Sequence, residues 1–294
     1  MVRALKTVFT GKRLKDEEDL KKHRRTVERL STVAVPVKKV NIETFYTGTI
    51  ECESVTPKQG YDESHVIFYI HGGGFICGGI AYARILAAKL AIATGYRTVS
   101  FAYRLAPEHP YPAAMEDALA VWEQLMTDGC SPERMLIAGD SAGGNMALCI
   151  VRHFIATGQG VPRELLLFSP WTDMTATAGS YEEYGDSDPM LTKEYVQYAV
   201  RAYIPEGEDV RDERFSPLNG SFEGFPPVYI MAGRNGILLD DSVRLQERIN
   251  GCGGRAVLDL EEKGWHVYQQ MPFPIANRAM ERLAGYVKDE INGK

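Results

Sequence analysis

From about His65 onward, short β-rich runs alternate with longer segments of helical periodicity. The runs HVIFYI, RTVSFAY and RMLIAG are each followed by such a segment: YARILAAKLAIATG, PYPAAMEDALAVWEQLMTDG and SAGGNMALCIVRHFIATG, respectively. Three more strand candidates follow, ELLLFSP, PPVYIMAG and RAVLDLEE, with helices expected at about Leu238 to Gly251 and Ile275 to Ile291. Alternation of this kind predicts an α/β fold with a mainly parallel sheet covered by helices on both faces.

Two segments interrupt this alternation. Residues 1–40 have an amphipathic helical pattern but precede the sheet, and residues 171–224 form a long insertion rich in Asp, Glu, Tyr and Gly. Ligands of open parallel sheets bind at the carboxyl ends of the strands, where inserted segments can cover them. We therefore predict an α/β core of residues 41–170 and 225–294, with a cap formed by residues 1–40 and 171–224.

Composition and charge exclude several classes of protein. The chain has 294 residues, of which 45% are hydrophobic and 24% charged, as in ordinary globular proteins. Its net charge of −6 provides no basic field that would attract nucleic acid or anionic lipid. The five cysteines are scattered without a CxxC pair, which favours reduced thiols and no metal site. No apolar run approaches the ~18 residues of a membrane span, and the N-terminal segment turns charged early. We expect a cytoplasmic protein with no nucleic-acid or membrane partner.

A candidate nucleophile lies in Gly139-Asp140-Ser141-Ala142-Gly143, which fits the pattern G-x-S-x-G. The motif stands between the expected strand RMLIAG and the helix that begins at Ala142. A tight strand-to-helix turn needs small residues on both sides of the serine so that its hydroxyl is exposed above the sheet. The N-terminus of the helix also stabilises developing negative charge. We predict Ser141 as the nucleophile; the alternative is a glycine-rich turn with no catalytic role.

A second motif, His71-Gly72-Gly73-Gly74, directly follows the expected strand VIFYI. Three glycines at the end of a strand allow backbone N–H groups to turn inward, and acyl transfer needs such donors for the oxyanion of the tetrahedral intermediate. We predict that Gly72 and Gly73 donate together with the N–H of Ala142. The alternative is a flexible loop without function.

The candidate general base is found by elimination among six histidines. Five of them are set aside by their positions. These are His23 in the leading helix, His65 at the start of a strand, His71 in the glycine loop, His109 in a proline-rich stretch and His153 far along the helix after Ser141. His266 lies in the loop GWHVY after the last expected strand. This position satisfies the chain order serine, acid, histidine of catalytic triads on such sheets.

The chain resembles the hormone-sensitive-lipase family of esterases. The similarity runs from about His65 to the C-terminus through FYIHGGGF, YRLAPEHPYPAA, GDSAGG, SPWTD, SDPMLT, SPL, FPPVYIMAG and GWHVYQ. It implies an α/β-hydrolase fold with a helical cap, hydrolysis of small-molecule carboxylic esters with short acyl chains, and no cofactor. A homodimer is expected by analogy alone.

The chain departs from the family at the triad acid. Members carry Asp or Glu about thirty residues before the catalytic histidine, and this chain has Gly236 there, in GRNGILLDD. Loss of the acid costs about four orders of magnitude in turnover in comparable enzymes. Asp240, about one helical turn further on, is a candidate replacement, directly or through a water. Alternatively, Asp240 and Asp241 only stabilise their own helix N-terminus, or Asn235 orients the histidine as a neutral acceptor.

Two functions therefore remain from the sequence. The first is a serine carboxylesterase that uses Ser141 and His266, with activity impaired by Gly236. The second is a weakened or inactive esterase-like protein that binds a ligand. The substrate stays open, because tyrosines of the insertion, among them Tyr195, are compatible with either a pocket or cap packing.

Overall fold

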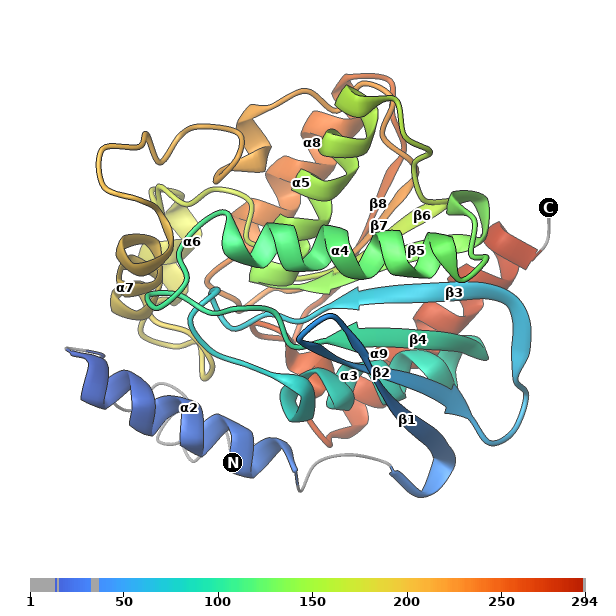
Figure 1. The fold of residues 1–294 in the computed structure, drawn as a ribbon. Helices are drawn as coiled ribbons and strands as arrows, with labels where there is room; N and C mark the ends of the chain where they lie inside the picture. The colour runs from blue at the N-terminus through green and yellow to red at the C-terminus, as the bar shows by residue number, and fades with distance from the viewer. Residues whose placement is uncertain (1–13, 15, 33–36, 293–294) are drawn as a thin grey trace.

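The computed structural model describes residues 14, 16–32 and 37–292. An eight-stranded sheet forms its centre, with the strand order β1-β2-β4-β3-β5-β6-β7-β8 (Figure 1). The strands are β1 (Val40–Thr47), β2 (Ile50–Pro57), β3 (Asp62–Ile70), β4 (Tyr96–Phe101), β5 (Met135–Asp140), β6 (Glu164–Phe168), β7 (Val228–Gly233) and β8 (Ala256–Glu261). All neighbours from β4 to β8 pair in parallel. The prediction of a mainly parallel sheet is confirmed.

The first two strands were not predicted. They pair antiparallel with one another, and β2 pairs antiparallel with β4. Their turn contains Gly48 at φ 58°, a left-handed conformation that favours glycine. Polar and apolar residues alternate only over residues 40–43 of β1, and the alternation breaks at Glu43-Thr44. This short alternation was a weak signal for a strand with one solvated face.

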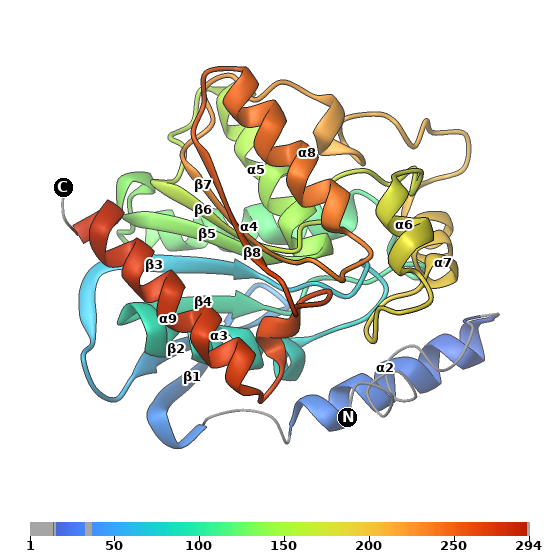
Figure 2. The same cartoon turned by 180° about the vertical axis from the view of Figure 1, so that it is seen from behind.

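Two groups of helices cover the two faces of the sheet (Figures 1 and 2). On one face α3 (Ile80–Thr94) and α9 (Pro274–Val287) bury side chains against Ile67 and Tyr69 of β3. The other face carries α4 (Ala113–Thr127), α5 (Ala142–Thr157) and α8 (Leu239–Gly251). There the core includes Phe68 and Ile70 of the same strand. Successive residues of β3 thus pack into opposite layers, which explains its continuous apolar run.

Three further helices lie near the carboxyl ends of the strands: α2 (Glu17–Ser31), α6 (Gly179–Tyr184) and α7 (Lys193–Tyr203) (Figure 1). Arg24 ties α2 to the core, since its Nε donates to the Ile76 carbonyl at 2.6 Å and its Nη1 to Glu108 at 2.7 Å. These helices come from the two segments expected to form a cap. Residues 1–13, 15 and 33–36 of that expectation lie outside the described residues.

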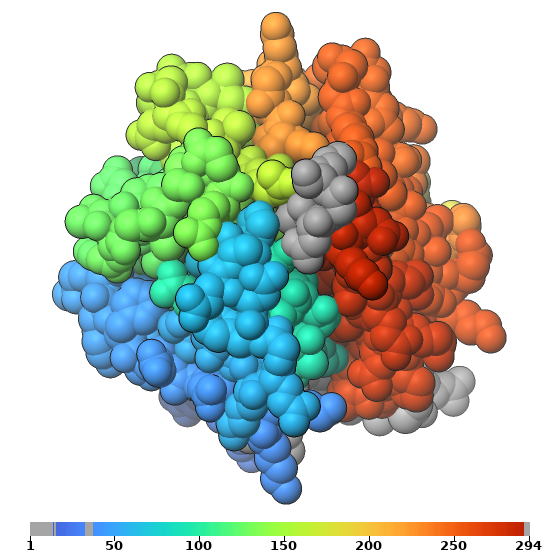
Figure 3. Space-filling model, turned by 90° about the vertical axis from the view of Figure 1, so that its right-hand side faces the viewer, coloured from blue at the N-terminus to red at the C-terminus, as the bar shows by residue number. Residues whose placement is uncertain are grey.

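Figure 3 shows the side of the molecule away from α7. The N-terminal strands, in blue, lie on the left of this face and the C-terminal segment, in red, on the right, with a teal segment between them. The strands β3 and β4 point the other way, toward α2, α6 and α7 (Figure 1). In the described part of the chain, no helix is both long and apolar enough to span a membrane.

Candidate active site

Ser141 occupies a sharp turn between β5 and α5. Its backbone has φ 53° and ψ −117°, which is rare for a residue with a side chain. The turn is held because the Ser141 N–H donates to the Phe168 carbonyl at 3.0 Å and the Ser141 carbonyl accepts from Trp171 N at 3.0 Å. Strain at a serine that is fixed in this way is typical of a nucleophile turn.

The glycines of the motif are needed for close backbone approach. A Cβ at Gly139 would collide with the backbone of Gly143, and one at Gly143 would collide with the carbonyl of Ile70. Only glycine therefore allows α5 to start directly against the ends of β3 and β5.

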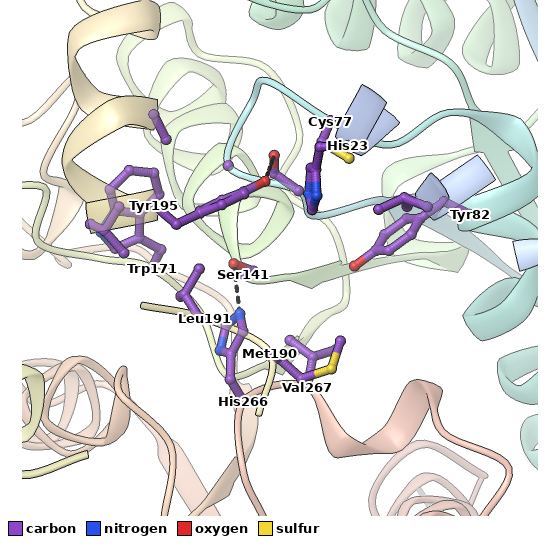
Figure 4. A pocket seen from close by; sticks show the side chains of 15 residues that line it. His23, Cys77, Tyr82, Ser141, Trp171, Met190, Leu191, Tyr195, His266 and Val267 are labelled. Carbon is purple, nitrogen blue, oxygen red and sulfur yellow. Dashed lines mark hydrogen bonds between the residues drawn. The ribbon is translucent and has the colours of Figure 1, made fainter. Parts of the chain in front are cut away.

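His266 lies beside Ser141. Its Nε2 is 3.0 Å from Ser141 Oγ, although 125 positions separate the two in the chain (Figure 4). Both side chains are buried, each with 6% of its surface exposed. Burial lowers the pKa of His266 to about 3, so the imidazole is neutral at physiological pH and able to accept a proton. The structure thus brings together the two residues on which a serine mechanism depends.

The glycine loop contacts the same turn, with one correction. The Gly72 N–H donates to Asp140 Oδ1 at 2.8 Å, and a Cβ at Gly72 would collide with that carboxylate. The amide is therefore occupied, which contradicts the prediction that Gly72 donates to an oxyanion. Gly73 and Gly74 line the pocket with Ser141 instead. Within the described residues, no backbone acceptor is recorded for the N–H of either one.

Asp140, the residue before Ser141, holds the glycine loop through hydrogen bonds to its carboxylate. Its carboxylate also accepts hydrogen bonds from Tyr69 Oη at 2.6 Å, Tyr82 Oη at 3.1 Å and Gln270 Nε2 at 3.2 Å. The carboxyl is fully buried, and desolvation raises its pKa to about 6 despite these donors. Asp140, to which the sequence analysis gave no role, is thus the centre of a polar network.

Gly236 lies beside His266. A Cβ built at Gly236 would be 3.1 Å from the His266 backbone nitrogen and 3.2 Å from the Gly233 carbonyl oxygen. The backbone of Gly236 is not in the left-handed region, so its conformation admits a side chain. His266 Nδ1 is buried without a hydrogen-bond partner among the described residues. No carboxylate in the described part of the chain occupies the place of a triad acid.

Neither candidate substitute hydrogen-bonds to the His266 ring. Asp240 Oδ2 accepts from the Ser180 N–H at 2.9 Å, which ties α8 to α6, so the structure does not bring Asp240 to His266. Asn235 donates its amide to the carbonyls of Glu262 and Gly264. The alternative interpretation of Asp240, a residue of the first turn of its own helix, fits this position better.

Two other buried carboxylates lie in this region. Asp241 Oδ1 accepts from the backbone N–H groups of Thr172 and Asp173 at 2.7 and 2.9 Å. Asp188 Oδ2 accepts from the backbone N–H groups of His266 and Ile237 at 3.2 and 3.0 Å. Sequence reasoning assigned Asp188 no role, although SDPMLT was the signal that could have indicated it.

A mostly apolar pocket opens above Ser141 (Figure 4). Its cavity volume is about 60 Å³. The walls come from α2, the insertion, the glycine loop and the histidine loop; the side chains that close them include His23, Val27, Trp171, Met190, Leu191, Tyr195 and Val196. Tyr195 also donates to the Gly73 carbonyl at 3.2 Å, so α7 braces the glycine loop. A serine hydroxyl, a neutral imidazole and a glycine loop that share a small apolar pocket are suited to acyl transfer.

Comparison with known proteins agrees with this geometry. A family described as having the alpha/beta hydrolase fold matches residues 67–270. A solved esterase from the bacterial hormone-sensitive lipase family superposes with a TM-score of 0.90 at 28% identity, over 99% of this chain and 97% of its own. The chain belongs to the hormone-sensitive-lipase family of α/β-hydrolases.

Curated relatives of this hormone-sensitive-lipase family member carry esterase names. An esterase from Acinetobacter venetianus is 33% identical over 76% of this chain and 74% of its own length. The carboxylesterase NlhH of Mycobacterium tuberculosis is 33% identical over 70% of this chain and 67% of its own. The esterase EstE5, solved after soaking with p-nitrophenyl butyrate, superposes with a TM-score of 0.88 at 29% identity, over 98% of this chain and 96% of its own.

Proposed function

We propose that this carboxylic ester hydrolase cleaves esters with short acyl chains through Ser141 and His266. The observation that carries the proposal is the 3.0 Å separation of Ser141 Oγ and His266 Nε2 in a pocket whose wall includes the glycine loop. The cavity of about 60 Å³ beside Ser141 is small and mostly apolar, which supports a short acyl group. The names of the relatives support ester hydrolysis.

In the first half-reaction, Ser141 Oγ attacks the ester carbonyl carbon while His266 Nε2 accepts the hydroxyl proton. The backbone N–H groups of Gly73, Gly74 and Ala142 are the proposed donors to the oxyanion. Because they are held in place before the reaction, they stabilise the tetrahedral intermediate without reorganisation. Collapse of the intermediate releases the alcohol, which takes the proton from His266 and leaves an acyl group on Ser141.

In the second half-reaction, a water attacks the acyl carbon and transfers its proton to His266 Nε2. The same backbone donors stabilise the second oxyanion. Its collapse returns the proton to Ser141 Oγ and releases the carboxylic acid. The histidine is protonated twice in one cycle, so the absence of a carboxylate at position 236 is expected to reduce the rate of both halves.

Hydrolysis of p-nitrophenyl acetate and p-nitrophenyl octanoate tests the proposal. We expect the acetate to be the better substrate, and we expect Ser141→Ala to lower kcat by at least about 10³-fold, with the folded state checked by circular dichroism. Asn145→Ala is not a suitable control, since Asn145 binds the Trp171 carbonyl beside the site. Thr157→Ala, at the far end of α5, is the matched control and should leave the rate unchanged.

A fluorophosphonate label separates a slow esterase from a ligand-binding protein. An esterase with an intact nucleophile is expected to gain the mass of the phosphonyl group on Ser141, and the alanine variant is expected to gain none. If the folded chain neither hydrolyses the acetate nor reacts with the label, the proposed function is wrong. The ligand-binding alternative would then account for the geometry of the pocket better than catalysis does.

A further inference from the structure

We propose that Asp188 is the positioning residue of His266: it holds the histidine loop in register with Ser141 and supplies the negative charge that stabilises the protonated imidazole. The inference rests on the proposed esterase function. Asp188 lies in the insertion, between α6 and α7. It would supply the carboxylate that the turn after β7 does not supply, because position 236 is glycine.

The contacts of Asp188 place it at the junction of three segments. One oxygen, Oδ2, accepts from the backbone N–H of His266 at 3.2 Å and from that of Ile237 at 3.0 Å. The other, Oδ1, accepts from Met190 N at 2.8 Å and Leu191 N at 3.3 Å. The carboxylate therefore joins the histidine loop, the turn that contains Gly236 and the part of the insertion that lines the pocket.

The carboxylate binds the backbone of the residue that carries the imidazole. The His266 backbone nitrogen that donates to Asp188 is four bonds from Nδ1 of the same residue, and Nδ1 is buried without a partner. The Asp188 side chain is itself fully buried, so little water screens its field.

Four backbone N–H donors favour the ionised form of a carboxyl group. Desolvation opposes them and raises the pKa of Asp188 to about 6, which leaves the group mainly ionised at pH 7 to 8. A fixed negative charge beside a buried histidine stabilises the imidazolium that forms when Ser141 loses its proton. Asp188 thus provides part of what a triad acid provides, without a direct hydrogen bond to Nδ1.

A double-mutant cycle distinguishes this task from a purely structural one. Asp188→Asn is made in the parent and in the Gly236→Glu variant, in which the introduced carboxylate can supply the missing charge. In the parent we expect kcat to fall by about 100-fold with KM within about threefold, and in the Gly236→Glu background we expect a fall of less than about fivefold. Equal losses in the two backgrounds would show that Asp188 only supports the fold.

Asp240→Asn is the matched control for the cycle. This carboxylate also accepts a backbone N–H next to the Gly236 turn, but from Ser180 instead of His266. We expect any loss caused by Asp240→Asn to be the same in both backgrounds. Asp188→Glu tests the charge separately, because it keeps the carboxylate while disturbing the four N–H contacts. A loss as large as that of Asp188→Asn would contradict the electrostatic part of the proposal.

A measurement without turnover separates this inference from the proposed function. The rate at which a fluorophosphonate labels Ser141 is measured at pH 8, where Asp188 is ionised, with and without Asp188→Asn. We expect the asparagine variant to be labelled about tenfold more slowly or worse, because a nearby carboxylate favours the imidazolium that forms when Ser141 attacks. An unchanged labelling rate in the folded variant would overturn the inference. Slower labelling of the variant, in a protein whose parent is labelled but hydrolyses no ester, would sustain it and reject the esterase proposal.

Discussion

The backbone N–H of Gly72 donates to Asp140 Oδ1 at 2.8 Å, so the residue before the nucleophile holds the start of the glycine loop. This contact occupies the amide of Gly72, whereas Gly73 and Gly74 line the pocket. The polar network around Asp140 thus connects the end of β3 with the nucleophile turn. Its integrity is expected to decide how well the oxyanion donors are placed.

Asp140→Asn is expected to lower kcat by about 10- to 100-fold with a smaller change in KM. The asparagine keeps one acceptor oxygen, but its NH2 group cannot accept a hydrogen bond. Depending on its orientation, the side chain therefore loses the bond from Gly72 or the bonds from Tyr82 and Gln270. Steady-state kinetics with p-nitrophenyl acetate measure the effect. Tyr69→Phe is the control, because it removes one donor and keeps the Gly72 contact. It should lower kcat less than Asp140→Asn does; a larger loss in Tyr69→Phe would argue against the role of Asp140 in holding the glycine loop.

Gly236→Glu is expected to raise kcat/KM for p-nitrophenyl acetate by up to about 10³- to 10⁴-fold. The new side chain would start 3.1 Å from the His266 nitrogen and could bring a carboxylate to the unpartnered Nδ1. The close neighbours are backbone atoms that must shift by a few tenths of an ångström, which lowers the gain if they resist.

Gly236→Gln is the matched control for that substitution. It adds nearly the same volume and an acceptor oxygen, but no charge, so we expect at most about a tenth of the gain. If the parent already turns over as fast as the Gly236→Glu variant, another group satisfies the histidine. In that case Asp188→Asn should lower kcat of the parent, as described above.

The pocket wall predicts acyl-chain preference. Leu191 is 8% exposed and lines the pocket, so Leu191→Ala is expected to enlarge the cavity on the side of the insertion. We expect the ratio of kcat/KM for the octanoate to that for the acetate to rise by about tenfold or more, since each accommodated methylene contributes about 1 kcal/mol. Leu191→Met, which conserves the volume, should leave the ratio within about threefold. An unchanged ratio in the alanine variant would place the acyl group elsewhere.

Asp241 is expected to make stability depend on pH. Burial raises its pKa from the usual range to about 7, so the folded protein binds a proton that the unfolded chain has already released between about pH 4 and 7. The contribution of this group to the free energy of unfolding is therefore complete below about pH 4 and is lost as the pH rises through about 7. The slope reaches at most about 1.4 kcal/mol per pH unit.

Urea unfolding of the parent and of Asp241→Asn at pH 5, 6.5 and 8 measures this effect. We expect the stability of the variant, relative to the parent, to increase from pH 5 to pH 8, because only the parent acquires a buried charge. A constant difference between the parent and Asp241→Asn would mean that Asp241 titrates alike in the folded and unfolded chains.

Much of the fold could be predicted because local patterns carry it. The alternating strands and helices from β3 to α9 follow from apolar runs, helical periodicity and glycine turns, which depend on near neighbours in the chain. The β1 and β2 hairpin was missed because its strands are mixed in polarity and were not separated from the segment before them. Ser141 and His266 could be selected from motif, strand context and chain order before their distance was known.

The sequence by itself determined the α/β class and the tight turn at Ser141, since hydrophobic periodicity and backbone sterics are local properties, and it selected His266 as the candidate base by elimination and chain order. It also showed that position 236 has no carboxylate. Only the tertiary structure decided which glycine amides are free, which carboxylate meets the histidine loop and where Asp240 points. Hydrogen bonds between Gly72 and Asp140, or between Asp188 and His266, join residues 68 and 78 positions apart. Such partners are selected by how the folded segments pack, and no local pattern encodes that choice.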